Sequence, residues 1–164
     1  MANTRHNKYL TFMLANEGYG IDIQKVREIN EMMPITPIPE TPAYMKGIIN
    51  LRGKIIPVID LRERFGMAVT AGSGDNRNCI IVAEIQNEAA KHSTGLIVDA
   101  VSEVCEIKPE QIEENVVLGS NVRSDYIRGI AKVNNQVKVL LNIDKVLSAE
   151  EVATIHEAAA AKDA

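Results

Sequence analysis

The stretch GIINLRGKIIPVIDL, residues 47–61, decides the fold that we expect for this chain. Two apolar runs rich in isoleucine and valine flank Arg52-Gly53-Lys54, which is the pattern of two β-strands joined by a tight turn. The stretch contains no nucleophile, no metal ligand and no glycine array that could hold a phosphate. If these residues have a function, they act as a surface.

The composition predicts a folded protein without a basic face. The chain has 164 residues, of which 46% are hydrophobic, so it can bury most of its unfolded surface in one or two small domains. Its 22 acidic and 18 basic side chains give a net charge of -4 and are mixed along the sequence, which argues against nucleic-acid binding.

The sequence also predicts a cellular compartment. Cys79 and Cys105 lie among apolar residues and form no Cys-x-x-Cys motif, which favours two buried thiols in a reducing environment over a disulfide. The N-terminus lacks an apolar signal segment, and no apolar run is long enough to span a membrane. We therefore expect a cytoplasmic protein that does not insert into the membrane.

Short strands dominate the rest of the pattern. Residues 9–14 and 19–23 predict two strands that are separated by a turn. Residues 33–42 contain four prolines, which fix φ and lack amide donors, so this segment must be extended and cannot be a central strand. Residues 62–66 predict a short helical turn that ends at glycine, and residues 70–76 predict a flexible connector.

The second half of the chain repeats the first. Residues 20–29 match residues 95–104 without gaps, and residues 44–48 match residues 126–130. In this alignment Arg52-Gly53 falls where Asn134-Asn135 falls in the second copy. Both dipeptides suit a two-residue hairpin that requires positive φ. The chain is therefore a duplicated β unit.

The duplication leads to a fold prediction. Each copy has several short strands and no long helix, which favours two small antiparallel barrels over a parallel βαβ sheet. The expected bounds are about 9–66 for the first subdomain, 67–77 for the connector and 78–147 for the second subdomain. Ser148 and Glu151 form a capping box, so we expect a C-terminal helix over about 149–161, docked by Val152 and Ile155.

No pattern predicts catalysis, a cofactor or a metal. His6, His92 and His156 share no local spacing, so we expect solvated histidines. Glu28 and Glu103 occupy equivalent positions in the two copies, and a pair of carboxylates can perform acid–base chemistry. Residues related by a repeat more often serve the same structural purpose twice, so we predict a protein that is not an enzyme.

Arg52 is the first candidate for a binding role. A tight turn needs only a residue such as Asn134, whereas an arginine is costly to order and offers five donors in a planar fork. Two interpretations stay open: a solvated turn residue, or a residue that pairs with Glu28 or with polar groups of a protein partner.

Two pairs of apolar residues next to the matched glutamates are further candidates. For Ile29, which follows Val26, we favour core packing. Val101 and Val104 could either pack in the core or line an apolar groove at the seam between two barrels. In the second copy, residues 114–121 are an insertion whose Val-Val-Leu segment predicts either an additional strand over a barrel or a contact surface.

Together these segments resemble a known family. The hairpin of residues 47–61, the preceding Val26-x-Glu28-Ile29 and the later Val101-Ser102-Glu103-Val104 closely resemble the CheW family of chemotaxis coupling proteins. The resemblance extends from about Tyr9 to Ile155. It implies two SH3-like five-stranded β-barrels around a shared core. It also implies a non-enzymatic adaptor that joins methyl-accepting receptors to the histidine kinase CheA in membrane-associated signalling arrays, as part of the two-component signalling that controls motility.

The resemblance also implies which residues bind. The cytoplasmic tip of the receptor would lie in a groove formed by Val26, Gly47, Arg52, Val101 and Val104, with Glu28 holding Arg52 in place. Val117 and Leu118 fall where the family contacts the regulatory domain of CheA to close rings, although a relative has an acidic-aromatic pair there. The implied protein is a monomer in solution and becomes multimeric in arrays.

Two other classes of function stay open. A β-barrel that binds a small ligand would need a deep closed pocket. An enzyme would need His or Ser converging with a carboxylate in one cleft.

Overall fold

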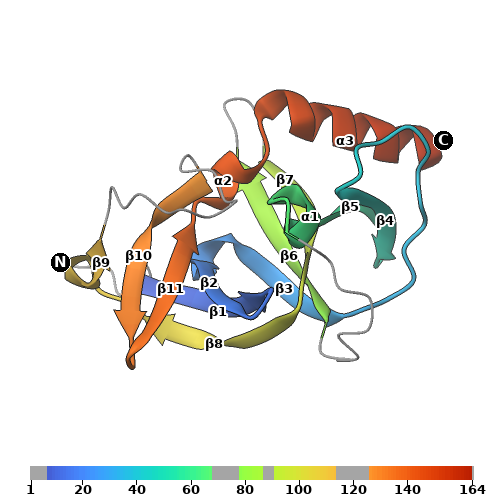
Figure 1. Ribbon diagram of the computed structural model, residues 1–164. Coiled ribbons are helices and arrows are strands. Elements are labelled where there is room, and N and C mark those ends of the chain that lie inside the picture. The colour runs from blue at the N-terminus through green and yellow to red at the C-terminus, as the bar shows by residue number, and fades with distance from the viewer. Residues whose placement is uncertain (1–6, 68–77, 87–90, 114–125, 164) are drawn as a thin grey trace.

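The computed structural model describes residues 7–67, 78–86, 91–113 and 126–163, and it consists mainly of β-strands (Figure 1). The first copy of the repeat contributes β1 (Lys8–Leu14), β2 (Glu17–Asp22), β3 (Val26–Glu31), β4 (Met45–Leu51) and β5 (Lys54–Asp60). The second copy contributes β6 (Cys79–Gln86), β7 (Lys91–Val98), β8 (Ala100–Glu106), β9 (Ile112–Glu113), β10 (Ile127–Val133) and β11 (Gln136–Leu141).

Helical segments are short except at the C-terminus. They comprise η2 (Ile23–Lys25), α1 (Leu61–Arg64), η3 (Pro109–Gln111), α2 (Ile143–Val146) and α3 (Ala149–Asp163). The prediction of a mainly β protein with a C-terminal helix is confirmed. The short helical turn expected after residue 61 is present as α1, and Asp60 caps it by accepting the amide of Arg62 at 2.9 Å.

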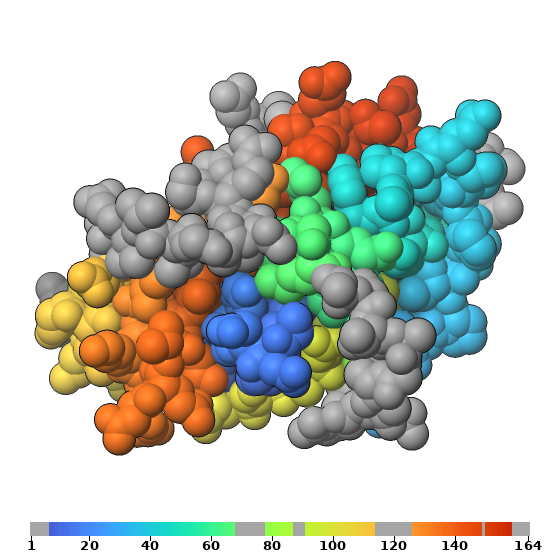
Figure 2. Space-filling model, viewed as in Figure 1, coloured from blue at the N-terminus to red at the C-terminus, as the bar shows by residue number. Residues whose placement is uncertain are grey.

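The two sheets exchange strands between the copies. Sheet A has six strands in the order β8-β1-β2-β11-β10-β9, and sheet B has five in the order β3-β6-β7-β5-β4. The first hairpin of each copy therefore lies in the sheet formed by the later strands of the other copy. In Figure 2 the blue first hairpin lies between the orange β10–β11 region and the green region around α1.

The exchange corrects two expectations. Sheets A and B do not follow the bounds 9–66 and 78–147, because the links after β2 and after β7 lead directly into the other sheet. The sheets are also not purely antiparallel, since β11 pairs with β2 and β5 pairs with β7 in parallel. The two parallel pairs use matched positions, Leu140 against Gly20 and Val58 against Gly95, so the repeat is preserved in the register.

The two predicted hairpin turns are confirmed. Leu51 pairs with Lys54 and Val133 pairs with Gln136, which leaves two residues in each turn. Arg52 has φ 52° and Gly53 has φ 84°, and the matched asparagines at 134 and 135 have φ 53° and 65°. All four residues are left-handed, as a type I′ hairpin requires.

The proline-rich segment closes one end of sheet B. Thr36 pairs with Ile48 of β4 through two backbone hydrogen bonds of 2.9 Å, so the chain that leaves β3 reaches the opposite end strand. β9 pairs with Ile130 of β10 at the matched position in sheet A. As predicted, this segment is not a central strand, and it makes only an isolated bridge. It is not extended throughout, because Pro39 and Glu40 form a turn in which Glu40 has φ 62°.

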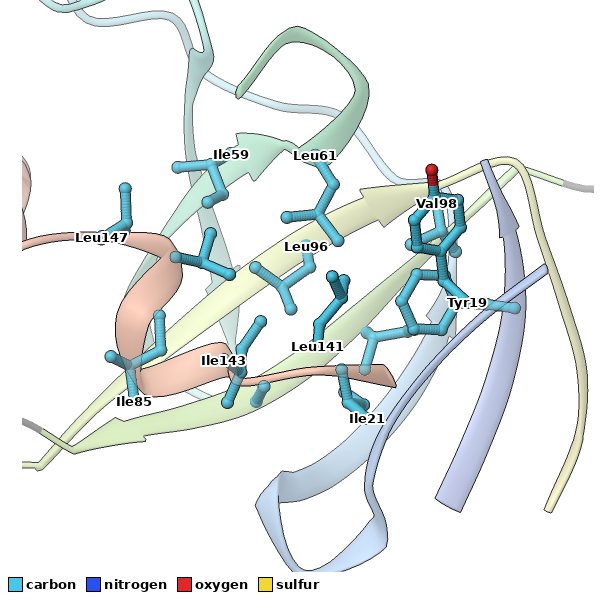
Figure 3. Packing of buried hydrophobic residues seen from close by; sticks show 14 of the residues in the cluster. Tyr19, Ile21, Ile59, Leu61, Ile85, Leu96, Val98, Leu141, Ile143 and Leu147 are labelled. Carbon is cyan, nitrogen blue, oxygen red and sulfur yellow. The ribbon is translucent and has the colours of Figure 1, made fainter. Parts of the chain in front are cut away.

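The largest hydrophobic core lies between the two sheets. It combines Leu10, Phe12 and Ile21 of sheet A with Ile81 and Leu96 of sheet B, all of which are at most 1% exposed. Figure 3 shows Leu96 close to Leu141, with Ile59 and Leu61 on one side and Tyr19 and Ile21 on the other. Each sheet also encloses a smaller cluster of its own.

The presence of a core on both faces of a sheet explains why several strands are continuous apolar runs in the sequence. In β6, Cys79, Ile81, Ala83 and Ile85 face the shared core, whereas Ile80 and Val82 face the cluster inside sheet B. Successive side chains of a strand point to opposite faces, so a strand with a core on both sides must be apolar at every position.

Helix α3 begins at the predicted capping box. The Glu151 amide donates to Ser148 Oγ at 3.0 Å, and the Ser148 amide donates to Glu151 Oε1 at 2.9 Å. Val152 and Ile155 are each 1% exposed and dock the helix, as predicted. Within the described residues, no helix is both long and apolar enough to span a bilayer.

Glu151 also ties α3 to the body of the protein. Tyr44 Oη donates to Glu151 Oε2 at 2.7 Å, and Arg64 Nη2 donates to Glu151 Oε1 at 3.1 Å. The Arg64 guanidinium lies 5.0 Å and 5.2 Å from the ring centroids of Tyr44 and Tyr126, the tyrosines at matched positions of the two copies. Burial, followed by the bond to Glu151, raises the pKa of Tyr44 to about 12, so its hydroxyl remains a donor.

Candidate functional site

The predicted binding residues lie on two strands that occupy equivalent places in the fold. β3 carries Val26 and Glu28, and it stands at one end of sheet B. β8 carries Val101 and Val104, and it stands at one end of sheet A. End strands leave backbone donors and acceptors available on one side, which makes them natural places for a partner to bind.

Large apolar side chains are exposed on these two strands. The described residues include four exposed large apolar side chains, and three of them are Ile29 (45% exposed), Met32 directly after β3 (43%) and Val104 (51%). Three of the four thus lie on, or directly after, the end strands that carry the predicted binding residues, which makes these strands the candidate protein-binding surface. We call β3, Met32 and β8 the two-strand surface.

The two residues of each apolar pair differ in exposure. Val26 and Val101 are partly buried against the shared core, whereas Ile29 is 45% exposed and Val104 is 51% exposed. In both strands the register shifts between the two residues, so simple alternation of faces does not describe the pairs. The core prediction for Ile29 is wrong, because its side chain is exposed. Of the two valines in β8, Val101 packs against the core and Val104 is exposed.

Arg52 and Glu28 form the predicted ion pair. Arg52 Nη1 donates to Glu28 Oε2 at 2.7 Å, and Nη2 donates to Glu28 Oε1 at 3.3 Å. The side-chain Nδ2 of Asn30 donates to Glu28 Oε1 at 2.8 Å. The bond from Arg52, and after it the bond from Asn30, lowers the pKa of the Glu28 carboxyl below its ordinary value.

The ion pair leaves Arg52 available to a partner. The Arg52 side chain is 77% exposed, whereas that of Glu28 is 24% exposed. Glu28 therefore holds the guanidinium on the side of the turn that faces β3, and the rest of the arginine fork points to solvent. Asn30 was not predicted as a member of this group, although its place two residues after Glu28 on the same strand face is a signal that could have identified it.

Gly47 has a steric role rather than an exposed position. The residue is buried, has φ 141°, and a Cβ atom there would overlap the carbonyl group of Thr36 in the proline-rich segment. Gly129, at the matched position of the second copy, would place a Cβ atom 2.5 Å from Ile112 Cγ2 of β9. Both glycines allow the crossing chain to close its sheet.

The remaining predicted contact, Val117 with Leu118 toward a kinase, lies outside the described residues. The insertion at residues 114–121 lies in the same undescribed range.

The histidines are placed differently from the prediction. The rings of His92 of β7 and His156 of α3 contact each other at a tilt of 39° with their centroids 4.4 Å apart, so these two side chains are not simply solvated. Burial, followed by the charge of His92, lowers the pKa of His156 to about 4. Among the described residues, no three His, Cys, Asp or Glu side chains converge in a way that could hold a metal ion.

One small pocket lies between the end of β2 and the start of α2. It has a volume of about 190 Å³ and is lined by Asp22, Lys25, Arg128, Leu141, Asn142 and Ile143. Pockets that hold small organic ligands usually have volumes of roughly 300–1,000 Å³. This pocket does not favour the small-ligand alternative.

Comparison with known proteins identifies relatives along nearly the whole chain. Residues 8–151 match the family model described as the CheW-like domain. The chain is 37% identical over 152 residues to the chemotaxis protein CheW of Klebsiella aerogenes, covering 93% of this chain and 88% of that protein. It is 32% identical over 152 residues to the chemotaxis protein CheW of Treponema pallidum, covering 92% of this chain and 87% of that protein.

A solved structure is also similar. The crystal structure of the scaffolding protein TtCheW from Thermoanaerobacter tengcongensis superposes with a TM-score of 0.76 at 40% sequence identity. The match covers 88% of this chain and 94% of that one.

Proposed function

The chain belongs to the CheW-like family, and we propose that it is a non-enzymatic adaptor that couples methyl-accepting chemotaxis receptors to the histidine kinase CheA. In this proposal the protein acts in the cytoplasm, where it is recruited to receptor arrays at the membrane. It carries no reaction of its own. It binds two partners at once, so that each binding event raises the effective concentration of the other partner.

The two-strand surface is the observation that supports the receptor half of the proposal. It presents the exposed apolar side chains of Ile29, Met32 and Val104 on two end strands, with the Arg52 guanidinium held beside β3. An apolar surface with one anchored arginine suits the tip of a helical hairpin, because apolar contacts supply affinity and the arginine supplies orientation. Small interfaces are individually weak, and repetition in an array would strengthen the binding.

In this proposal the conformational state of the receptor changes kinase activity through differences in binding free energy. If the adaptor contacts one receptor state better than another, then the binding of receptor and kinase must be linked reciprocally. The coupling needs no chemistry in the adaptor, and this agrees with a candidate surface built from valines, isoleucine, methionine and one ion pair.

The test is reconstitution. Purified protein should co-sediment with receptor-containing membranes and should raise the autophosphorylation rate of CheA only when receptor is present. Protein that binds neither component, or that turns over a substrate unaided, would contradict the proposal.

A variant pair locates the receptor contact. Val104→Asp should reduce receptor co-sedimentation by about tenfold or more, because a charge in an apolar contact costs more than a lost methyl group. Binding of CheA should change much less. Val137→Asp is the matched control, since Val137 is 54% exposed but lies on β11 outside the two-strand surface. Equal loss with both variants would remove Val104 from the contact.

A further inference from the structure

Each strand of the two-strand surface begins at a charged contact between the two sheets. β8 follows Asp99, the residue at which the chain passes from sheet B to sheet A. Arg62 Nη1 of α1 donates to Asp99 Oδ1 at 2.7 Å. Asp99 in turn accepts the amide of Ala15, in the β1–β2 turn, at 2.7 Å and donates its own amide to the Met13 carbonyl at 3.0 Å. We call this set of contacts the Arg62 clamp.

The arginine of this clamp is held firmly. Arg62 Nε and Nη2 donate to the two oxygens of Asp60 at 3.0 Å and 2.8 Å, which is a bidentate pair. Arg62 is 9% exposed and Asp60 is 3% exposed, so the pair has little water to compete with it. Because Asp60 ends β5 of sheet B and Asp99 leads into sheet A, the guanidinium joins the two sheets directly.

The other crossing provides an internal comparison. β3 follows Lys25, where the chain passes from sheet A to sheet B, and Lys25 Nζ lies 2.8 Å from Asp144 Oδ2 of α2. Asp144, which matches Arg62 in the repeat, also accepts the amide of Gln86 at 2.8 Å. The charges are reversed, and the Lys25 and Asp144 side chains are 27% and 28% exposed. The contact between the sheets is a single ion pair at both crossings, and Asp99 is 26% exposed, much like Asp144. The difference lies in the cation: the Arg62 side chain is 10% exposed and is held by two further bonds to Asp60, whereas the Lys25 side chain is 27% exposed. The Lys25 ammonium is therefore held less firmly than the Arg62 guanidinium.

We propose that Arg62 is a positioning residue that, by binding Asp99, fixes where the chain leaves sheet B to begin β8 and thereby sets the spacing between β8 and β3. The Lys25 contact is the weaker of the two and contributes less to this spacing. The expected effect of Arg62 on receptor binding rests on the proposed function. Its expected effect on the relative position of the two sheets does not depend on that function.

Arginine suits this position for a geometric reason. Its three donating nitrogens contact two carboxylates that lie on different elements, which a lysine ammonium at the same place cannot reproduce in a fixed orientation. The Ala15 amide adds a constraint, because Ala15 has φ 50°, a conformation that an L-residue keeps only when its surroundings hold it.

The sharpest variant is Asp99→Asn. Its amide oxygen can still accept from Ala15, whereas its NH2 group faces the donor of Arg62, so the variant removes the contact between sheets and leaves Arg62 on Asp60. Arg62→Lys is the second variant and removes the fork itself. Lys25→Gln is the matched control at the other crossing.

The readout is a distance between spin labels on the two strands. Labels on cysteines introduced at Glu31 of β3 and Ser102 of β8 report the spacing between the sheets, and labels at Ser102 and Gln136 report a distance within sheet A. Cys79 and Cys105 are each 9% exposed and burial raises the pKa of both thiols, so brief labelling at neutral pH selects the introduced cysteines.

Asp99→Asn should broaden and displace the Glu31–Ser102 distance distribution while the Ser102–Gln136 distribution stays unchanged. Receptor co-sedimentation should fall by roughly threefold to thirtyfold, the range expected when the coupling between two elements is altered. Lys25→Gln should change both measurements much less. Unchanged distances in both Asp99→Asn and Arg62→Lys would overturn the proposal, as would equal changes within sheet A, which indicate general unfolding.

The two proposals can fail separately. If the wild-type protein binds no receptor but Asp99→Asn still displaces the labels, then the adaptor function fails and the positioning role stands. If the wild-type protein binds receptor and neither clamp variant moves the labels, then the positioning role fails and the adaptor function stands.

Discussion

Arg52 and Asn134 occupy the same turn position in the two copies, with φ 52° and 53°, so the backbone at this position requires nothing that only an arginine provides. The difference between the two turns lies in the partner. Arg52 bonds to Glu28 on β3 and remains 77% exposed. At the scale of single residues, the comparison of the two copies shows that the hairpin requires only positive φ at this position, and that the arginine side chain is an addition on the surface of the first copy.

We expect Arg52→Ala to reduce receptor binding by about tenfold, within the range of arginine hot spots, while thermal unfolding changes little. Both properties should be measured on the same preparation. Asn134→Ala is the control, since it changes the matched turn and should leave receptor binding intact. If Arg52→Ala lowered the unfolding temperature strongly and binding survived, Arg52 would belong to the scaffold.

For Gly47, in contrast to Arg52, we expect a substitution to reduce the stability of the fold. Gly47→Ala should lower the free energy of unfolding by about 2–4 kcal/mol, because the methyl group overlaps the Thr36 carbonyl and the backbone has positive φ. Gly53→Ala is the control, because Gly53 also has positive φ but has nothing within 4 Å of its Cβ position. It should cost only about 1–2 kcal/mol. Urea unfolding measures both, and equal costs would show that crowding at Gly47 is unimportant.

At the scale of elements, helix α3 is attached by a few specific contacts. Val152 and Ile155 supply the apolar docking, Glu151 binds Tyr44 and Arg64, and the His156 ring packs at a tilt against His92 of β7. Only the docking residues and the capping box were predicted from the sequence. The bonds of Glu151 to Tyr44 and Arg64 and the histidine contact were not, because these partners lie far apart in sequence and share no motif.

The partly buried position of His156 against His92 should make the free energy of unfolding depend on pH. The unfolded chain protonates His156 at its ordinary pKa of 6.5, whereas the folded protein does so only near a pKa of about 4. The unfolded state therefore binds more protons between these values, and stability falls as the pH falls through this window. After allowance for solvent screening, we expect a loss of about 1–2 kcal/mol between pH 7 and pH 5.

The measurement is chemical unfolding at pH 7 and pH 5 for the wild type and for His156→Gln. The variant should lose most of the difference between the two pH values. The pKa values of carboxylates such as Glu28 and Glu151 are lowered in the folded protein, so the stability that they contribute is lost mainly below pH 5. An equal pH effect in the variant would assign the loss to other groups.

At the scale of the whole molecule, the exchange of strands between the two copies determines how the protein should fold. Sheet A needs the β1–β2 hairpin from the first copy, sheet B needs the β6–β7 hairpin from the second, and the largest core lies between the sheets. Neither copy can bury its apolar faces alone, so the two halves should fold as one cooperative unit.

Cutting the chain in the connector tests this expectation. Fragments 1–72 and 73–164 should be largely unfolded when separate and should form a folded complex when mixed, because each supplies strands that the other lacks. Circular dichroism of the separate and mixed fragments and size-exclusion chromatography of the mixture measure the outcome. A fragment that unfolds cooperatively by itself would show that one copy is self-sufficient.

The sequence by itself determined the strands, the two hairpin turns, the capped helix and the duplication. Each of these follows from local rules: alternation and β-branching, positive φ at Arg52-Gly53 and Asn134-Asn135, and reciprocal bonds between Ser148 and Glu151. The ion pair of Glu28 with Arg52 was also anticipated: the repeat comparison left it as one of the open interpretations, and the family resemblance implied it.

The tertiary structure decided which strands share a sheet and which face of each strand is covered. Strand pairing between distant segments depends on where the chain crosses, and the short links at Lys25 and Asp99 send the chain into the other sheet. For the same reason Ile29 is exposed, Gly47 is buried beneath Thr36, and His92 meets His156. These outcomes depend on contacts between residues far apart in sequence, and a local pattern contains no information about them.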